Sequence, residues 1–227
     1  MRAFLSTYGA EMARLTLQHV VIVLVAVLVA TVAGVPAGIW ATRNRIAGRV
    51  ILRFADLMQT IPSLAMFGFL IPLPLIGGIG TRTAIVALVL YSLLPIVRNT
   101  AIGIQQVDPV VREAGVAMGM TDGQILRQLE LPLATPTLVA GLRIATVIAV
   151  GVATIAAAIG GGGLGVLIFR GVAMVDTPLI LAGALPAALL AFVADLGFSA
   201  LERMLARRRG ESGDGVRLGR SENLVKT

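Results

Sequence analysis

The side chains that most often carry covalent or metal chemistry are almost absent from this sequence of 227 residues. There is no cysteine, which excludes thiolate nucleophiles, thiolate metal sites and disulfides. The only histidine is His19, so a zinc site of the two-histidine type is excluded as well. The only lysine, Lys226, follows Val225, and a G-x-x-x-x-G-K-[ST] phosphate-binding loop needs a glycine there. We therefore expect no catalytic centre, no metal and no cofactor in this chain.

The most informative polar segment lies between residues 108 and 132. Asp108 is followed by a proline, which is favoured at the first position of a helix. Gly119 can end that helix, Thr121 can cap a second short one, and Pro132 is expected to stop it. Two short helices at an angle would form a compact projection suited to docking into a groove of another protein. A surface loop that merely covers the protein is the alternative interpretation.

The elements around this segment are predicted to be membrane spans. Apolar residues make up 57% of the chain and charged residues only 14%, against about 45–50% and about 25% in soluble domains. A spanning helix needs about 20 mostly apolar residues. The segments that meet this requirement are about 16–39, 57–81 (kinked, with Pro62, Pro72 and Pro74), 83–105, 136–159 and 177–201. A cleavable signal peptide is the alternative for the first, but its apolar core would be only about 7–15 residues long.

The basic residues indicate the orientation of these five spans. With the N-terminus outside, 15 of the 19 basic residues lie in inner segments, as the positive-inside rule requires. The outer ones are Arg2, Arg14, Arg82 and Arg170. We therefore predict an all-α integral membrane protein with five transmembrane helices, an outer N-terminus and a cytoplasmic C-terminus. The isoelectric point of about 11.3 thus reflects membrane orientation and not nucleic-acid binding.

The segment from residue 108 to 132 then resembles a known pattern. Permease subunits of binding-protein-dependent ABC importers carry the sequence motif E-A-A-x(3)-G-x(9)-I-x-L-P, in which x is any residue. The matching residues here are Glu113, Ala114, Gly115, Gly119, Leu129, Leu131 and Pro132. Gly115 stands where alanine is usual, and Leu129 stands where isoleucine is usual.

This resemblance implies a type I ABC importer permease fold in the bacterial inner membrane. The 108–132 segment would be the cytoplasmic two-helix coupling loop that sits in a cleft of a partner ATPase, and that partner would bind ATP and Mg. A second permease subunit, either the same chain or a related one, and an extracytoplasmic substrate-binding protein would complete the importer. The permease domain would span 1–201 and lie in the lipid bilayer, and 202–227 would be a polar, disordered cytoplasmic tail.

Two other segments indicate which subgroup of these importers the chain resembles. A glycine run, which loses much backbone entropy on ordering, follows the fourth span on the outer side. It resembles the outer loop and short helix of the five-span importers for methionine and for quaternary amines, which implies an outer gate; a flexible connector is the alternative. The gate residues would be Gly160, Gly161, Gly162, Gly163 and Gly165. Residues 54–65 resemble permeases for glycine betaine, choline and carnitine, with methionine or another amino acid as the alternative substrate.

Few polar side chains lie within the predicted spans. Asp56, Arg143 and Asp195 lie near span ends, where boundary anchors or interhelical pairs are expected. We expect His19 to be interfacial. Neutral side chains can line a translocation path without a large burial cost, and the candidate path residues are Gln59, Pro62, Ser63 and Asn99.

Two other classes of protein have to be weighed against a permease. Secondary transporters and channels commonly contain internal repeats, but none is visible here and five spans do not divide into equal halves. An intramembrane protease would need a catalytic signature, and G-x-S-x-G is absent while H-E-x-x-H is excluded by the single histidine. Both classes fit the sequence less well than a permease does.

Overall fold

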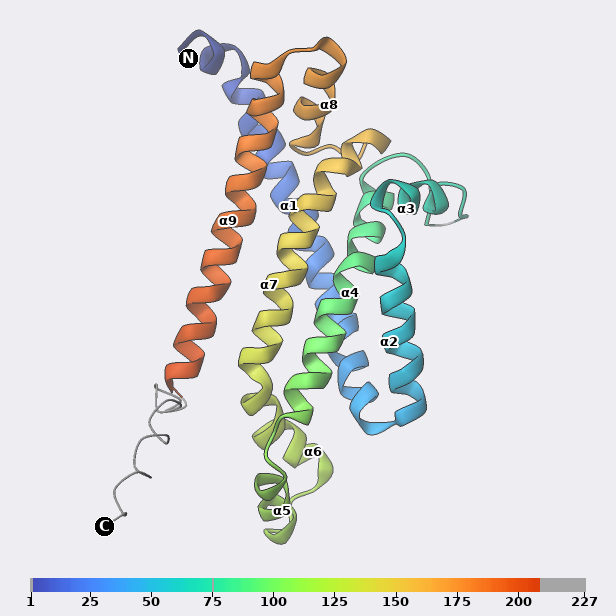
Figure 1. Ribbon diagram of the computed structural model, residues 1–227, viewed down its shortest axis with the longest axis vertical. Coiled ribbons are helices and arrows are strands. Elements are labelled where there is room, and N and C mark those ends of the chain that lie inside the picture. The colour runs from blue at the N-terminus through green and yellow to red at the C-terminus, as the bar shows by residue number, and fades with distance from the viewer. Residues whose placement is uncertain (1, 75, 209–227) are drawn as a thin grey trace, which may run out of the picture.

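A computed structural model describes residues 2–74 and 76–208, and all regular elements among them are helices. Four helical segments are long and apolar enough to cross a membrane, and a bent helix pair can supply a fifth crossing. The elements are α1 (Arg2–Arg43), α2 (Arg45–Thr60), α3 (Ser63–Leu70), α4 (Thr81–Gln105), α5 (Pro109–Ala117), α6 (Asp122–Gln124), the π-helix η1 (Ile125–Glu130), α7 (Leu131–Ile155), the 3₁₀-helix η2 (Ala156–Ile159), α8 (Gly165–Met174) and α9 (Thr177–Arg208) (Figure 1). The predicted all-α membrane fold is confirmed.

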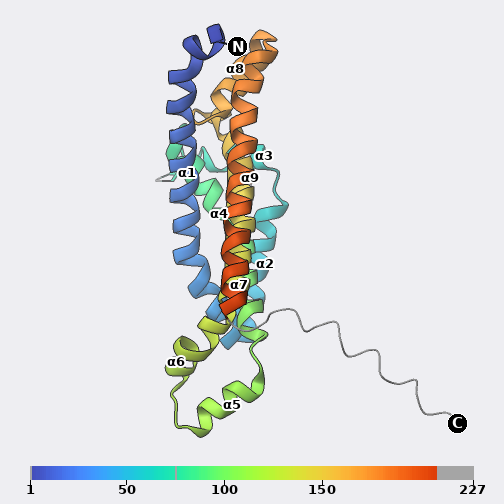
Figure 2. The same cartoon turned by 90° about the vertical axis from the view of Figure 1, so that its left-hand side faces the viewer.

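Helix α4 lies between α1 and α7, and α9 packs on α7 and α8 (Figures 1 and 2). Glycines allow these helices to approach closely, as small residues do in membrane bundles. A Cβ atom added to Gly38 on α1 would lie 2.6 Å from the Cβ of Thr100 on α4. One added to Gly141 on α7 would lie 2.7 Å from the Cβ of Asn99. Gly38 and Gly141 therefore allow α4 to lie close to both α1 and α7.

The second span differs from its prediction. It begins at Arg45, earlier than the predicted 57, and α2 and α3 meet at an angle of 106°. The bend follows from Pro62, because a residue that precedes proline is driven out of the helical region and Ile61 is extended (φ −72°, ψ 126°). Beyond α3 the chain turns and does not continue as a helix, so the bent pair covers residues 45–70 and the predicted bounds 57–81 were wrong.

The fourth span also differs, because Pro132 does not stop a helix. Residues from Asp122 to Ile159 form one helical segment that passes through both Pro132 and Pro136. Pro132 lies in the first turn of α7, where a missing N–H is tolerated. The preceding turns are a π-helix, whose wider winding accommodates the break in the α-helical bonding pattern.

The two ends of the bundle carry different elements. The start of α1 lies with α8 at one end, and α5 and α6 project at the other end, beyond the end of the α9 ribbon (Figures 1 and 2). Helix α9 continues to Arg208, past the predicted boundary at 201. The remainder of the predicted tail, 209–227, lies outside the described residues.

Candidate functional site

The projection at the α5–α6 end, which we call the knob, comprises residues 108–130. Its first helix begins at Asp108, whose side chain accepts a hydrogen bond from the Val110 N–H at 2.9 Å. Gly119 has φ +79°, a left-handed conformation that glycine adopts without steric cost. Thr121 and Gln124 then form a reciprocal capping box at the start of the second helix. The predicted starts of both helices are confirmed.

The inner face of the knob brings two positions of the sequence motif together. Gly115 is buried, and a Cβ atom added to it would lie 2.9 Å from Leu129 Cδ1 and 3.4 Å from Ile125 Cγ1. The motif thus places a small residue on α5 and an apolar residue on η1, and these two residues pack against each other where the helices meet. These contacts fix the angle between the two helices.

The outer face of the knob is open. Glu113 and Ala114 are exposed, in contrast to the buried Gly115 beside them. Three large apolar side chains on this part of the chain are also mostly exposed: Val110 (67%), Val116 (63%) and Met118 (73%). An exposed apolar surface with a carboxylate beside it is typical of a protein contact site. Leu131 and Pro132 lie at the base of the knob, where α7 begins.

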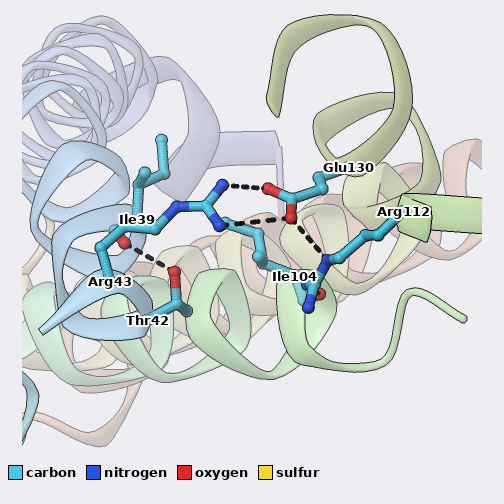
Figure 3. Close-up of polar contacts among 6 residues, drawn as sticks. All are labelled: Ile39, Thr42, Arg43, Ile104, Arg112 and Glu130. Atoms are coloured by element: carbon cyan, nitrogen blue, oxygen red, sulfur yellow. Dashed lines mark hydrogen bonds and ion pairs between the residues drawn. The ribbon is translucent and has the colours of Figure 1, made fainter. Parts of the chain in front are cut away.

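One residue at the base of the knob was missed by the sequence analysis. Glu130 is fully buried, and its carboxylate contacts Arg43 at the end of α1 and Arg112 on α5 (Figure 3). It occupies the one unspecified position between Leu129 and Leu131 in the motif. The only sign of this pairing in the sequence was that Glu130 lies between two leucines. A carboxylate buried there without a partner would cost free energy, so a partner was to be expected.

Three of the four candidate path residues lie at the bend between α2 and α3. Pro62 and Ser63 form the bend, and Gln59 Nε2 donates a hydrogen bond to the backbone oxygen of Tyr91 at 3.2 Å. The Tyr91 hydroxyl in turn donates to the backbone oxygen of Ile61, which the bend leaves without a helical partner. Tyr91, which the sequence did not single out, therefore holds this bend from α4.

Asn99 does not join that group. Its side-chain amide donates to the Pro95 backbone oxygen at 2.8 Å on the same helix. It also lines an open cleft of about 550 Å³, together with Gln106, Thr137 and Glu202. The four candidate path residues thus mark two places along the bundle and do not form one binding site.

The glycine run is held against α1. Gly160, Gly162 and Gly163 have positive φ, which turns the chain between η2 and α8. The Gly163 N–H donates to Gln18 Oε1 at 3.2 Å, so α1 fixes the turn. An added Cβ at Gly165 would lie 1.8 Å from the Thr154 backbone oxygen, which shows how closely α8 approaches α7. The glycine residues therefore belong to a packed turn, contrary to the alternative of a flexible connector.

His19, which was expected to be interfacial, is enclosed by the protein. His19 is fully buried, and its Nδ1 accepts a hydrogen bond from the Leu164 N–H at 3.3 Å. Its Nε2 lies 3.2 Å from the Val150 backbone oxygen, so the proton is on Nε2. The backbone amide of the glycine turn needs an acceptor, and that requirement draws the imidazole inward.

The charged residues near the span ends are interhelical pairs, as expected. Arg143 Nε on α7 lies 2.6 Å from Asp195 Oδ1 on α9. Asp56 pairs with Arg98 of α4 at 2.6 Å. These contacts join α7 to α9 and α2 to α4, and the side chains remain partly exposed.

The chain resembles known proteins over most of its length. Residues 34–210 match the family described as binding-protein-dependent transport system inner membrane component. The choline transport system permease protein OpuBB of Bacillus subtilis is 43% identical over 89% of this chain and 92% of that protein. The osmoprotectant import permease protein OsmW of Salmonella typhimurium is 47% identical over 81% of this chain and 86% of its own length.

A solved structure of the MetNI methionine ABC transporter in an inward-facing conformation matches with a TM-score of 0.78. The match covers 86% of this chain and 95% of the solved chain. Because the sequence identity is only 23%, this likeness shows the fold alone. The helical bundle, the knob and these likenesses agree, and the chain belongs to the family of inner membrane components of binding-protein-dependent transport systems, the permease subunits of ABC importers.

Proposed function

We propose that this chain forms half of the membrane core of an ATP-driven importer for a quaternary-amine osmoprotectant such as glycine betaine, choline or carnitine. The substrate class is supported by the names of relatives that are 43% and 47% identical over most of the chain. Methionine or another amino acid is the second candidate, supported only by a fold likeness at 23% identity. The closer sequence relationship favours the osmoprotectant.

The single observation that carries the coupling role is the exposed outer face of the knob. Glu113 lies on it beside exposed apolar side chains, at the end of the bundle opposite α8. We expect a cytoplasmic ATPase to bind this face, with a second permease subunit presenting an equivalent knob to a second ATPase. ATP-driven closure of the two ATPases then moves the knobs, and the spans alternate between inward-open and outward-open arrangements.

Selection of the substrate falls to an extracytoplasmic binding protein. A quaternary ammonium ion is recognised by several aromatic rings through cation–π attraction. Tyr91 is buried and its hydroxyl holds the α2–α3 bend, while Trp40 lies on α1 with its side chain 59% exposed. The two residues lie on different helices, and we expect the permease to offer a path and not a selective site.

The test is transport by a reconstituted complex. A tagged chain is purified with the ATPase that accompanies it, placed in proteoliposomes and supplied with its binding protein and ATP. ATP-dependent uptake of radiolabelled glycine betaine, choline or carnitine supports the proposal. Uptake of methionine alone contradicts the substrate class, and hydrolysis of ATP by the rigorously pure chain contradicts the permease role.

A further inference from the structure

Glu130 joins three elements at the base of the knob. Arg43 Nη1 donates to Glu130 Oε1 at 3.3 Å and Nη2 donates to Oε2, so the pair is bidentate (Figure 3). Arg112 Nε lies 2.6 Å from Oε1, as an ion pair without hydrogen-bond alignment. The carboxylate is on η1, Arg43 is the last residue of α1, and Arg112 is on α5.

Arg112 is fixed on its other side. Its Nη2 donates to the backbone oxygen of Ile104, near the end of α4, at 2.6 Å. This bond ties α5 to α4 across the turn that enters the knob. A chain of contacts thus runs from α1 through Glu130 to α5, and on to α4 (Figure 3).

The burial of the Glu130 carboxylate indicates that it fixes the relative orientation of the elements that it joins. The Glu130 side chain is 0% exposed, while those of Arg43 and Arg112 are 43% and 33% exposed. A buried carboxylate is stabilised only when it is paired, and an apolar residue of similar size would fill the same place at lower cost in desolvation. A bidentate arginine contact, in contrast, fixes the relative orientation of two elements.

We propose that Glu130 is a positioning residue that transmits knob movement to the first span through Arg43. This inference rests on the proposed function, because it assumes that an ATPase moves the knob. The two helices of the knob pack on each other through Gly115 and Leu129, so they move together. Arg43 then carries that movement to α1, while α7 receives it directly because η1 continues into α7.

The test measures substrate taken up per ATP hydrolysed, for the purified complex in proteoliposomes. Glu130→Gln keeps the shape and removes the charge. Arg43→Gln cuts only the link to α1, because Glu130 keeps Arg112 and position 43 is partly exposed. We expect both variants to retain the bound ATPase and to hydrolyse ATP, with uptake per ATP lowered by about tenfold, as loss of a charge-assisted contact would give.

The matched control is Asp56→Asn, which removes a carboxylate from an interhelical pair whose side chains are 49% and 46% exposed. Exposed pairs contribute little, so its uptake per ATP should equal that of the wild type. A purely structural role for Glu130 would reduce the amount of complex but not this ratio. The double variant Arg43→Gln with Glu130→Gln should be no worse than Glu130→Gln alone, because Glu130→Gln already cuts the link to Arg43.

If Arg43→Gln takes up as much substrate per ATP as the wild type, the inference is overturned, whatever the result for Glu130→Gln. The proposed function has a separate test in Glu113→Ala, on the outer face of the knob. If Glu113→Ala loses ATPase binding while Arg43→Gln keeps a normal uptake per ATP, only the proposed link to α1 is contradicted. Normal ATPase binding and normal uptake in both Glu113→Ala and Gly119→Val contradicts the coupling role of the knob itself.

Discussion

Gly115 determines how closely the two helices of the knob approach. Its hydrogen faces Leu129, Ile125 and Met120, with the nearest atom 2.9 Å from the position of an added Cβ. That atom is the terminal methyl of a flexible side chain, which can shift by a few tenths of an ångström. A small addition at this position is therefore tolerable, while a large one must separate the helices.

We predict that Gly115→Ala keeps ATPase binding and that Gly115→Leu loses it. Overpacking of this kind costs about 1–3 kcal/mol, enough to displace α5 from η1. Co-purification of the ATPase with a tagged chain measures the effect. Gly123→Ala is the control, because an added Cβ there meets nothing within 4 Å. Full ATPase binding by Gly115→Leu would show that the knob angle is unimportant.

Gly163 is the corresponding position at the other end of the bundle. It has φ +76°, and an added Cβ would lie 2.9 Å from His19 Nδ1. Gly163→Ala should therefore lower the thermal midpoint in detergent, because left-handed backbone costs a non-glycine residue about 1–2 kcal/mol and the clash adds to it. Gly68→Ala, in open space on α3, should leave the midpoint unchanged or raise it. Equal midpoints for the two variants would contradict the packed turn.

At the scale of elements, the bend between α2 and α3 depends on a hydroxyl group of α4. Tyr91 donates to the Ile61 backbone oxygen, while the buried hydroxyl of the next residue, Ser92, has no hydrogen-bond partner among the described residues. We predict that Tyr91→Phe lowers stability by about 1 kcal/mol and that Ser92→Ala does not. Thermal unfolding of the two variants compares a bonded with an unbonded hydroxyl. A larger loss in Ser92→Ala would refute this account of the bend.

The same elements show how far the sequence could predict the structure. Apolar runs that contain a single arginine each located α4 and α7, and Asp108, Gly119 and Thr121 marked the turns of the knob. Pro62 predicted a kink, but the angle of 106° depends on tertiary contacts with α4 that local patterns do not contain. Pro132 was taken as a stop because proline usually ends helices, and here it begins α7 instead.

The candidate site was predictable only where it depends on neighbours in sequence. The motif singled out both Gly115 and Leu129, and the local signals Asp108, Gly119 and Thr121 placed the two helices that carry them, but only the structure shows that the two residues are in contact. The contacts of Glu130 with Arg43 join residues far apart in the chain, and a single sequence carries no sign of that pairing. The burial of His19 depends likewise on a distant backbone amide, that of Leu164.

At the scale of the whole molecule, the distribution of arginine predicts which end faces the cytoplasm. The chain lacks cysteine, so single cysteines report exposure without background. Gly123→Cys on the knob should react with a membrane-impermeant reagent only from the cytoplasmic side. Ile79→Cys, 81% exposed beside the glycine turn, should react only from the outside. The reverse pattern would invert the orientation and remove the knob from any cytoplasmic partner.

The most direct test of the central claim is a crosslink from the outer face of the knob. Val116→Cys, at a side chain 63% exposed, is labelled with benzophenone maleimide in the assembled complex and irradiated. We expect a covalent product between this chain and the ATPase, and none from Ile79→Cys at the other end. A crosslink to the ATPase from Ile79→Cys, or none from Val116→Cys in a complex that still contains the ATPase, would contradict it.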